Sequence, residues 1–464
     1  MPMDKILPRR WRWLAAPLAA CLTAACTSAA TASPAVSGSA SGSASAPAAR
    51  SAAVPAAAPL NCAPPNVKLV PCFSPRAYEV AYGVAPLLSR GIDGHGATVV
   101  IPALAQVPEA RGGPTDIRQD LATFDRTFGL PPARLQVVNT IARSATPYLT
   151  NDEELEDTEM VHAIAPGATL AVVLVPANAT ESIPDFTADL TKVVQAAVTR
   201  HAAVISISAS VGEHLVTRAE AARMHAALVQ ASQQHVTVVA SSGDNGAISD
   251  DGPPVQVSLP ASDPLVLAVG GTILGAAPDG TYHGEMAWNG GTDGSAGGYS
   301  SLYPRPSYQD GVPGAGAPRA GTGRAGTPLA DDGRGVPDVA ASADHASGMA
   351  LAFSDGSLRS AVGTSGSTPL WAGVIALADS AADHSLGFVN PALYAIARGP
   401  AYHRAFHDVV TGDNSVVWPT GVFTGYDAGP GWDPVTGWGS PDARYLVPLL
   451  ARGAALAILA RGAA

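Results

Sequence analysis

The strongest candidate for a chemically reactive residue in this sequence is a serine in a turn that begins with glycine. Residues 361–369 read Ala-Val-Gly-Thr-Ser-Gly-Ser-Thr-Pro, and an apolar helix is predicted directly after them. A helix that begins here directs its free N–H groups and the positive end of its dipole toward Ser365. Ser365 is therefore a candidate nucleophile. An ordinary N-cap serine on a buried helix would have the same local pattern.

A run of acids forms the second candidate, at residues 151–159. Asn151 and the Pro-Gly pair at 166–167 mark the start and the stop of a helix. Glu153 and Asp157 are four residues apart, so their side chains are neighbours on one face. Two close carboxyl groups do not both ionise easily, and one of them then carries a proton in the acid range. The alternative is that these acids only offset the helix dipole.

The third candidate is Asp244, which follows an apolar strand in the glycine-bracketed turn of residues 239–246. The carboxyl ends of parallel strands face the ligand site in open α/β sheets. A protonated aspartate at such a position could donate a hydrogen bond to an oxyanion. A turn aspartate with no chemical role is the common alternative.

Apolar strand patterns alternate with helical patterns through the middle of the chain. Strands are predicted at residues 97–101, 170–175, 204–208, 236–240 and 266–269, and helices at 75–84, 116–128, 185–201 and 219–235. This alternation predicts an α/β fold with a parallel sheet and helices on both faces. Residues 311–335 are rich in Gly, Pro and Ala and are predicted to form a long surface loop.

The composition indicates a globular protein and excludes a basic nucleic-acid-binding protein. The chain has 464 residues, of which 47% are hydrophobic and 14% charged, so it can bury a sizeable core. Its formal charge is −11 and its lysines number only three, which excludes a basic surface for nucleic acid. The expected partners are polypeptide substrates, and the chain is expected to be a monomer.

The N-terminal region has the pattern of an export signal. In residues 1–26, three arginines precede an apolar segment too short to span a membrane. Cys21 and Cys26 each end a stretch that resembles the bacterial lipoprotein processing box. We therefore expect an exported protein, extracellular or lipid-anchored at the cell envelope. Simple secretion, with cleavage among the alanines, is the alternative.

Three further segments complete the predicted organisation. Residues 27–61 are almost wholly Ala, Ser, Thr, Gly and Pro and are predicted to be a disordered tether. Residues 62–450 are predicted to form a single catalytic domain, and residues 451–464 an Ala/Arg/Gly tail. Cys62 and Cys72 are expected to form a local disulfide worth about 2–3 kcal/mol, the alternative being two free thiols.

Several motifs, in their order and spacing, are together highly specific. They are residues 120–125, Ala-Ile-Ala-Pro-Gly-Ala at 163–168, Ser-Ser-Gly-Asp at 241–244, Trp-Asn at 288–289, Gly-Tyr-Ser at 298–300, Gly-Val-Pro-Asp-Val at 335–339 and Gly-Thr-Ser at 363–365. With them the chain, from about residue 74 to 442, resembles the sedolisin family of serine-carboxyl peptidases, which has a subtilisin-like fold.

The resemblance implies a role for the candidate serine and for each of three acids. Ser365 corresponds to the nucleophile, Glu153 to the general base and acid, Asp157 to the aspartate that orients it, and Asp244 to the oxyanion aspartate. Several acids lie close together at residues 152–159. Asp157 is identified by its sequence separation from the family motif at residues 163–168, and Glu153 is then found by counting back from Asp157. The implied reaction is acid-acting endopeptidase cleavage through an acyl-enzyme on Ser365.

The family also binds one structural calcium ion near its C-terminus. Residues 406–409 and 428–434 resemble its two ligand segments. The expected ligands are the carboxylates and carbonyls of Asp408, Val409, Gly429, Gly431 and Asp433. Such all-oxygen donors suit a hard cation, and glycines let carbonyls turn inward. Two ordinary turns are the alternative.

The sequence also departs from the family pattern. Ala-Ser at 209–210 replaces the usual Trp-Gly after the substrate strand, so the family's subsite preference is not carried over. The family usually has a large prodomain, and only the tether of residues 27–61 precedes the predicted domain, so autoactivation of the usual kind is not expected.

Two other functions are compatible with parts of this sequence. A conventional subtilisin with a Ser-His-Asp triad needs a His-Gly-Thr helix start, which the sequence lacks, and His162 is expected to be a packing residue. The other alternative is an inactive surface lipoprotein of the same fold.

Overall fold

The computed structural model of the chain describes residues 60–63, 69–104, 115–139, 149–176, 182–312 and 333–462. The predicted export signal, nearly all of the predicted tether and most of the predicted 311–335 loop lie outside the described residues. Among the described residues, no helix is both long enough and apolar enough to cross a membrane.

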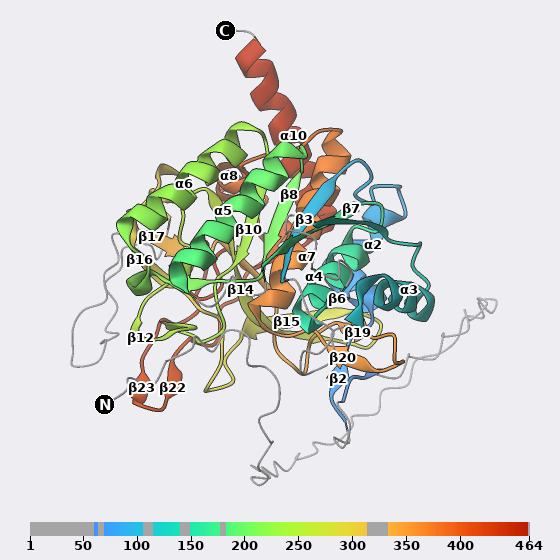
Figure 1. Ribbon diagram of the computed structural model, residues 1–464, viewed down its shortest axis with the longest axis horizontal. Helices are drawn as coiled ribbons and strands as arrows, with labels where there is room; N and C mark the ends of the chain where they lie inside the picture. Colours follow the sequence, from blue (N-terminus) through green and yellow to red (C-terminus); the bar gives the residue numbers. More distant parts are fainter. Residues whose placement is uncertain are drawn as a thin grey trace, which may run out of the picture.

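A central sheet of eight strands organises the described part of the chain (Figure 1). Its strands are β15 (Tyr282–Ala287), β14 (Val266–Ala276), β10 (Thr237–Ser241), β8 (Val204–Ile207), β3 (Thr98–Leu104), β7 (Thr169–Val175) and β5 (Arg134–Asn139), in that spatial order, with β18 (Val339–Ser342) beside β14. Every pair is parallel except β14 with β15. The predicted fold class, a subtilisin-like parallel sheet, is therefore confirmed.

Both faces of the sheet are buried, which is why its strands are apolar at nearly every position. Along β3, Val99 and Ile101 join one hydrophobic core while Val100 joins the other. Alternate residues of a strand point to opposite faces, so each apolar run supplies two cores at once.

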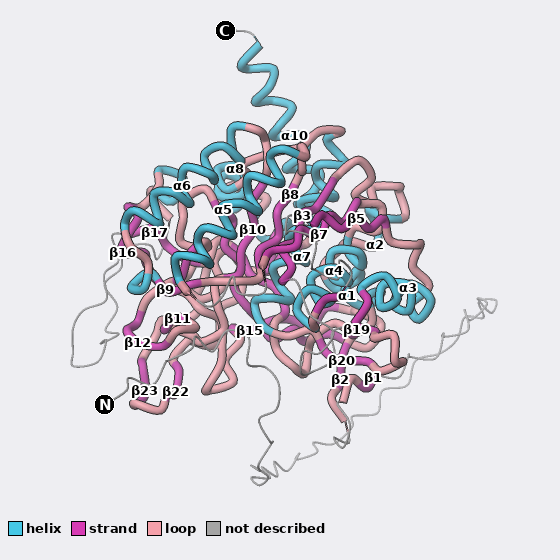
Figure 2. Tube along the Cα trace, in the orientation of Figure 1, coloured by secondary structure: helices cyan, strands magenta, loops and turns pink. Residues whose placement is uncertain are grey.

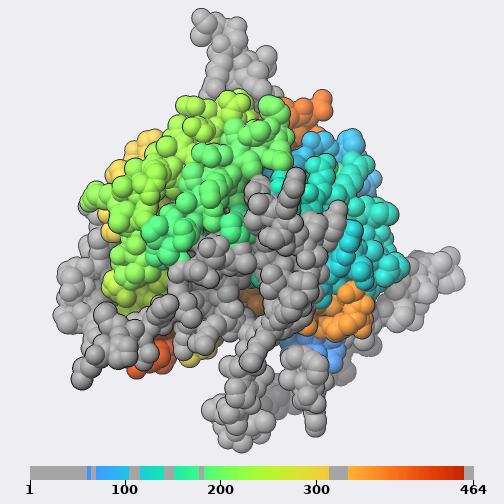
Figure 3. Space-filling model, in the orientation of Figure 1, coloured from blue at the N-terminus to red at the C-terminus, as the bar shows by residue number. Residues whose placement is uncertain are grey.

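Helices cover the two faces in separate layers. Helices α5 (Ile183–Thr199) and α6 (Arg218–Gln233) pack on the core that contains Val100, and they form the green surface of Figure 3. Helices α4 (Asp152–Ile164) and α7 (Gly363–Ala382) pack on the other core. The remaining helices are α1 (Pro75–Ala81), α2 (Ala85–Leu88), α3 (Ile117–Phe128), α8 (Asn390–Ala397), α9 (Tyr402–Ala405) and α10 (Ala443–Gly462).

Loops and short hairpins gather at one end of the sheet, the lower end in Figure 2. The two-residue strands β9 (Val211–Gly212) and β11 (Ile248–Ser249) lie there and follow β8 and β10 along the chain. This end therefore carries the carboxyl ends of β8 and β10, where the chain leaves the sheet toward the predicted site. The other short strands are β4 (Thr115–Asp116), β6 (Leu149–Thr150), β12 (Gly252–Val255), β13 (Ser258–Leu259), β19 (Ala350–Ala352), β20 (Leu358–Ser360), β21 (Phe406–His407), β22 (Val416–Trp418), β23 (Gly421–Phe423) and β24 (Ser440–Pro441).

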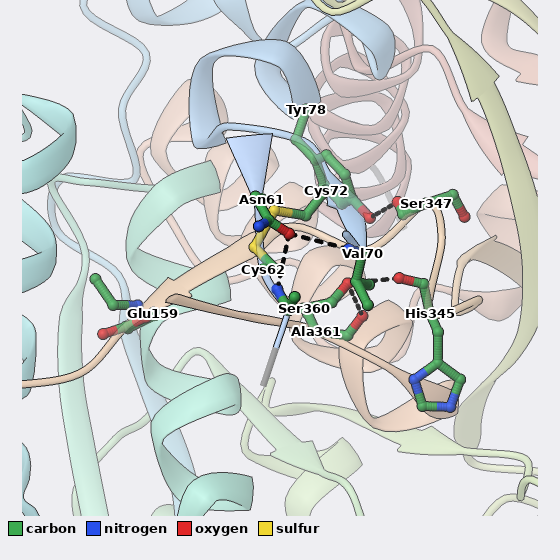
Figure 4. Close-up of a disulfide and its surroundings, with 12 residues drawn as sticks. Asn61, Cys62, Val70, Cys72, Tyr78, Glu159, His345, Ser347, Ser360 and Ala361 are labelled. Atoms are coloured by element: carbon green, nitrogen blue, oxygen red, sulfur yellow. Dashed lines mark hydrogen bonds between the residues drawn. A yellow bond between two sulfur atoms is a disulfide. The ribbon is translucent and has the colours of Figure 1, made fainter. Parts of the chain in front are cut away.

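The predicted disulfide between Cys62 and Cys72 is confirmed (Figure 4). It fastens β1 (Leu60–Asn61) beside β2 (Pro71–Cys72), and both cysteines are buried. The next residue, Phe73, exchanges backbone hydrogen bonds with Gly348 and Ala350. The start of the domain is thereby tied to the hairpin that leads to Ser365.

Two predicted boundaries differ from the structure. Residues 333–336, predicted as the end of a loop, form strand β17 (Gly333–Val336), which pairs with β16 (Gly298–Pro304). The pairing is set by a distant strand, so the local Gly-rich composition hides it. Helix α10 runs without a break through residue 450, where the tail was predicted to begin.

Candidate active site

Ser365 lies in the first turn of α7, as its third residue, rather than on a turn before the helix as predicted. The helix begins at Gly363, whose φ of +78° favours glycine. A Cβ atom at Gly363 would lie 2.6 Å from Asp244 Oδ2. This glycine therefore lets the oxyanion candidate and the nucleophile turn approach each other.

A proline inside α7 changes the hydrogen bonding at Ser365. Pro369 has no N–H, so the Ser365 carbonyl loses the helical partner that residue 369 would normally supply. The Ser208 hydroxyl, just beyond β8, lies 3.3 Å from this carbonyl oxygen and 2.6 Å from Asp157 Oδ1. Its single proton is donated mainly to the nearer oxygen, that of Asp157, or is shared between the two. Ser208 thus links the supporting aspartate to the backbone of the nucleophile.

The three acids at the start of α4 have different hydrogen-bond partners. The Asn151 side chain accepts the N–H groups of Glu153 and Glu154, and Glu154 Oε2 accepts the Asn151 N–H at 2.9 Å. Glu154 is therefore engaged in a capping box. Asp152 pairs on the surface with Arg359. Of the first three acids, Glu153 is the one that turns toward Ser365.

Glu153, Asp157 and Ser365 form the centre of the site. Burial raises the pKa of Glu153 above its usual range, and the nearby Ser365 hydroxyl opposes this shift. Glu153 Oε1 is buried and has no hydrogen-bond partner among the described residues. Burial, followed by the charge of Glu153, raises the pKa of Asp157 well above its usual range. A carboxyl pair of this kind holds a proton that can be shared.

Asp244 binds the nucleophile turn directly. Its Oδ1 accepts the N–H of Thr364 at 2.7 Å and the Thr364 hydroxyl at 2.8 Å. Its own N–H donates to Asp250 Oδ1 at 2.8 Å. Burial, and then the charge of Asp250, raises the pKa of Asp244 to about 7. Below that pH, Asp244 is a neutral acid beside Ser365.

The structure therefore brings the four predicted catalytic residues to one place, at the start of two helices and the end of β10. Ser365 is half-buried and remains accessible from solvent, whereas Asp157 is only 3% exposed. A hydroxyl group beside two buried carboxyl groups, with a further acid at the same turn, is an arrangement that can support acyl transfer.

His162 takes no part in this arrangement. It is fully buried on α4, and its Nε2 lies 2.9 Å from the Pro131 carbonyl and 3.0 Å from Asp125 Oδ1. Within the described ranges, no contact joins it to Ser365. Its partners agree with the predicted packing role and give no support to a Ser-His-Asp triad.

Sequence reasoning missed two residues at this site. Ser208 was noted only as part of a strand motif, and its bridge between Asp157 and Ser365 depends on tertiary placement. Glu156 is a third buried carboxyl group, whose Oε1 accepts the Val362 N–H at 2.9 Å. A signal for Glu156 was available, because it is three residues after Glu153 and thus on the same helix face.

The two predicted calcium segments also come together. Both oxygens of Asp408 accept the Gly431 N–H at 3.1 Å, and Asp433 Oδ2 accepts the Gly429 N–H at 3.0 Å. The carboxyl groups of the two segments therefore both contact the backbone of residues 429–431, and these carboxylates with nearby carbonyl oxygens are donors of the type that a hard cation binds. Among the described residues, no group of three or more His, Cys, Asp or Glu side chains could hold a metal. Carbonyls would have to complete the set, as predicted.

Comparison with known proteins shows which family the chain belongs to. The family model described as the subtilase family matches residues 144–394. Kumamolisin from Bacillus sp. (strain MN-32) is 34% identical over 361 residues, which are 76% of this chain and 59% of that protein. Sedolisin from Pseudomonas sp. (strain 101) is 32% identical over 356 residues, covering 72% and 56%. This chain thus spans less than two thirds of the length of either relative.

A solved structure gives the same answer for the fold. Pseudomonas sedolisin, a serine-carboxyl proteinase complexed with two molecules of pseudo-iodotyrostatin, matches with a TM-score of 0.64 and 26% identity. The match covers 83% of this chain and all of that chain. The chain therefore belongs to the subtilase family and, within it, to the sedolisins.

Proposed function

We propose that the protein is a serine-carboxyl endopeptidase that cleaves polypeptides in acid through an acyl-enzyme on Ser365. The observation that carries this proposal is the geometry around Ser365: the Ser208 hydroxyl lies within hydrogen-bond distance of Asp157 Oδ1 and of the Ser365 carbonyl oxygen, and Asp244 Oδ1 accepts the Thr364 N–H. Family membership supports the same reaction class.

Each step assigns one task to one group. Ser365 Oγ attacks the peptide carbonyl while its proton passes to Glu153, which later gives that proton to the leaving amine. Asp157 holds the remaining shared proton and orients Glu153. Protonated Asp244 donates to the oxyanion of the tetrahedral intermediate. Water then attacks the acyl carbon with Glu153 as the base, releasing the acid product and restoring Ser365.

The test is digestion of a denatured protein at pH 4 by the wild type and by Ser365→Ala. We expect the variant to lose roughly 10⁴–10⁶-fold in kcat, because the acyl-enzyme cannot form. Circular dichroism and the melting temperature serve as the folding control. A folded Ser365→Ala variant with near-normal activity would refute the assignment.

Calcium and export belong to the same proposal. We propose that Asp408 and Asp433, with the carbonyls of Val409, Gly429 and Gly431, hold one structural calcium ion. We also propose export through residues 1–26, with lipidation at Cys21 or Cys26. Both cysteines lie outside the described residues, and their sequence motifs are the support. The mass of the mature N-terminus tests lipidation: a start at alanine or serine with no added mass refutes it.

The inactive-lipoprotein alternative has less support, because all four catalytic residue types lie together in hydrogen-bonded register. The same digestion experiment separates the two functions, since an inactive protein hydrolyses nothing at any pH.

A further inference from the structure

The start of the nucleophile helix lacks the cap that other helices of this protein have. Helices α4 and α6 each begin with a capping box, in which the third residue of the helix accepts the N–H of the N-cap residue. In α7 the N-cap is Val362, which has no side-chain cap, and the third residue is Ser365. The nucleophile thus occupies the position that would normally carry the capping Glu or Gln.

An acid from another helix makes the missing bond. Glu156 of α4 accepts the Val362 N–H through Oε1 at 2.9 Å. It is only 6% exposed. A Cβ atom at Gly366 would lie 2.7 Å from the same oxygen, so Glu156 contacts the turn on both sides of Ser365. Together with Asp244, which holds Thr364, it fixes the backbone of this turn.

We propose that Glu156 is a positioning residue that caps α7 from α4 and so fixes the nucleophile relative to its base. This inference rests on the proposed function for its kinetic consequences, although the capping bond is a property of the fold. Glu156 does not touch the reacting atoms in this account and acts through the Val362 N–H.

Several ionisable groups face Glu156 and would respond to its charge. They are Glu153 and Asp157 on the same helix, Asp244 beyond β10, and Tyr78 on α1. Burial raises the pKa of Glu156, and the charges of Glu153 and Asp157 raise it further. These shifts keep Glu156 protonated in acid, so its charge appears only toward neutral pH. A neutral carboxyl group still has an acceptor oxygen for the Val362 N–H.

Two substitutions separate the cap from the charge. Glu156→Gln keeps an acceptor oxygen for Val362 and removes the charge, whereas Glu156→Leu removes both in a similar volume. Glu159→Gln is the matched control, because Glu159 is buried on the same helix and accepts a backbone N–H from Ala352 instead, at 2.9 Å.

We would measure kcat and KM for a peptide substrate from pH 3 to pH 8, with amide exchange of the peptide that contains Val362. Glu156→Leu should lower kcat about 10- to 100-fold with little change in KM, and speed exchange at Val362. Glu156→Gln should restore kcat to within about threefold and leave the pH profile in acid unchanged, because a neutral acceptor oxygen remains for the Val362 N–H. Glu159→Gln should change neither the profile nor that exchange.

Wild-type kcat and wild-type exchange in Glu156→Leu would overturn the inference. If Glu156→Leu does not fold, Glu156→Asp decides, because its shorter side chain withdraws the acceptor from the Val362 N–H; wild-type kcat and wild-type exchange at Val362 in that variant overturn the inference. An inactive wild type would instead refute the proposed function. In that case amide exchange at Val362 in the two variants still decides whether Glu156 caps α7.

Discussion

Two regions of this molecule bury carboxyl groups in opposite ways. Asp338 is fully buried, and Arg334 donates to its Oδ2 at 2.6 Å. Asp338 also accepts the Ala268 N–H at 2.8 Å, the Tyr394 hydroxyl at 2.8 Å and the Asn390 amide at 3.2 Å. Every donor around it favours the ionised form, with Arg334 opposing the rise in pKa that burial causes.

At the candidate active site the neighbours of each acid are mostly other acids. Glu153 has one oxygen with no partner, and Asp157 accepts from Ser208. Within the described ranges, no Lys or Arg pairs with Glu153, Asp157 or Asp244. This difference in hydrogen-bond partners distinguishes Asp338, which stabilises the fold, from the active-site acids, which can exchange a proton. A saturated carboxylate is fixed, whereas an under-satisfied one is free to change state.

Among the substitutions that test this difference, the largest effect on kcat is expected when the base candidate Glu153 is replaced by a neutral amide. Glu153→Gln should lower kcat by about 10²–10⁴-fold, because the amide cannot take the proton of Ser365. Steady-state kinetics at pH 4 measure this loss. Glu159→Gln makes the same chemical change on the same helix and should remain near wild type. Equal losses in both variants would mean that Glu153 has no special role.

Removing the cation of the structural pair should act on stability instead. Arg334→Met leaves Asp338 buried without its charge partner and should cost about 3–5 kcal/mol of unfolding free energy. Urea titration measures it. The double variant Arg334→Met with Asp338→Leu should recover much of the loss, since no unpaired charge remains. A loss that the second substitution does not reduce would contradict this reading of the pair.

Calcium removal should have a smaller effect, confined to the loop of Asp408 and Asp433. A bound ion at about 100 times its Kd stabilises the folded state by about 2.7 kcal/mol. Chelation should therefore lower the melting temperature of the wild type, and Asp433→Ala should abolish that sensitivity. Identical melting in chelator and in excess calcium would count against the site.

The sequence predicted the elements whose signals are local. Strands β3, β7, β8 and β10 were each predicted to within three residues, because their apolar runs are buried on both faces. The start of β14 was also predicted, but this strand continues seven residues beyond the predicted end, to Ala276. Strands β5, β15 and β18 were not predicted. In β5, only partly buried, apolar residues alternate with exposed ones, and β15 is half-exposed at the sheet edge. Strand β18 is fully buried but only four residues long. Pairing partners, not local pattern, define these three strands.

The candidate site divides in the same way. Residue types, helix spacing and turn chemistry made Glu153, Asp157, Ser365 and Asp244 candidates, and the family resemblance selected them and implied their roles. Contacts across the fold could not be predicted. The Ser208 bridge depends on Pro369 freeing the Ser365 carbonyl, and the Glu156 cap depends on how α4 packs against α7.

The central claim is that catalysis at this site depends on protonated carboxyl groups. The pH dependence of kcat/KM tests this claim most directly. The pKa of Asp244 is raised to about 7, so its carboxyl group is protonated and donates below that pH. As pH rises through this value, Asp244 becomes an anion that repels the oxyanion. Activity should therefore be highest in acid and fall through neutrality.

Profiles from pH 3 to pH 8 for the wild type, Asp244→Asn and Asp244→Ala give the result. Asp244→Ala should lose about 10²–10³-fold at the optimum, and Asp244→Asn should lose less because its amide still donates. A wild-type maximum near pH 8, with Asp244→Ala unimpaired, would contradict the carboxyl mechanism.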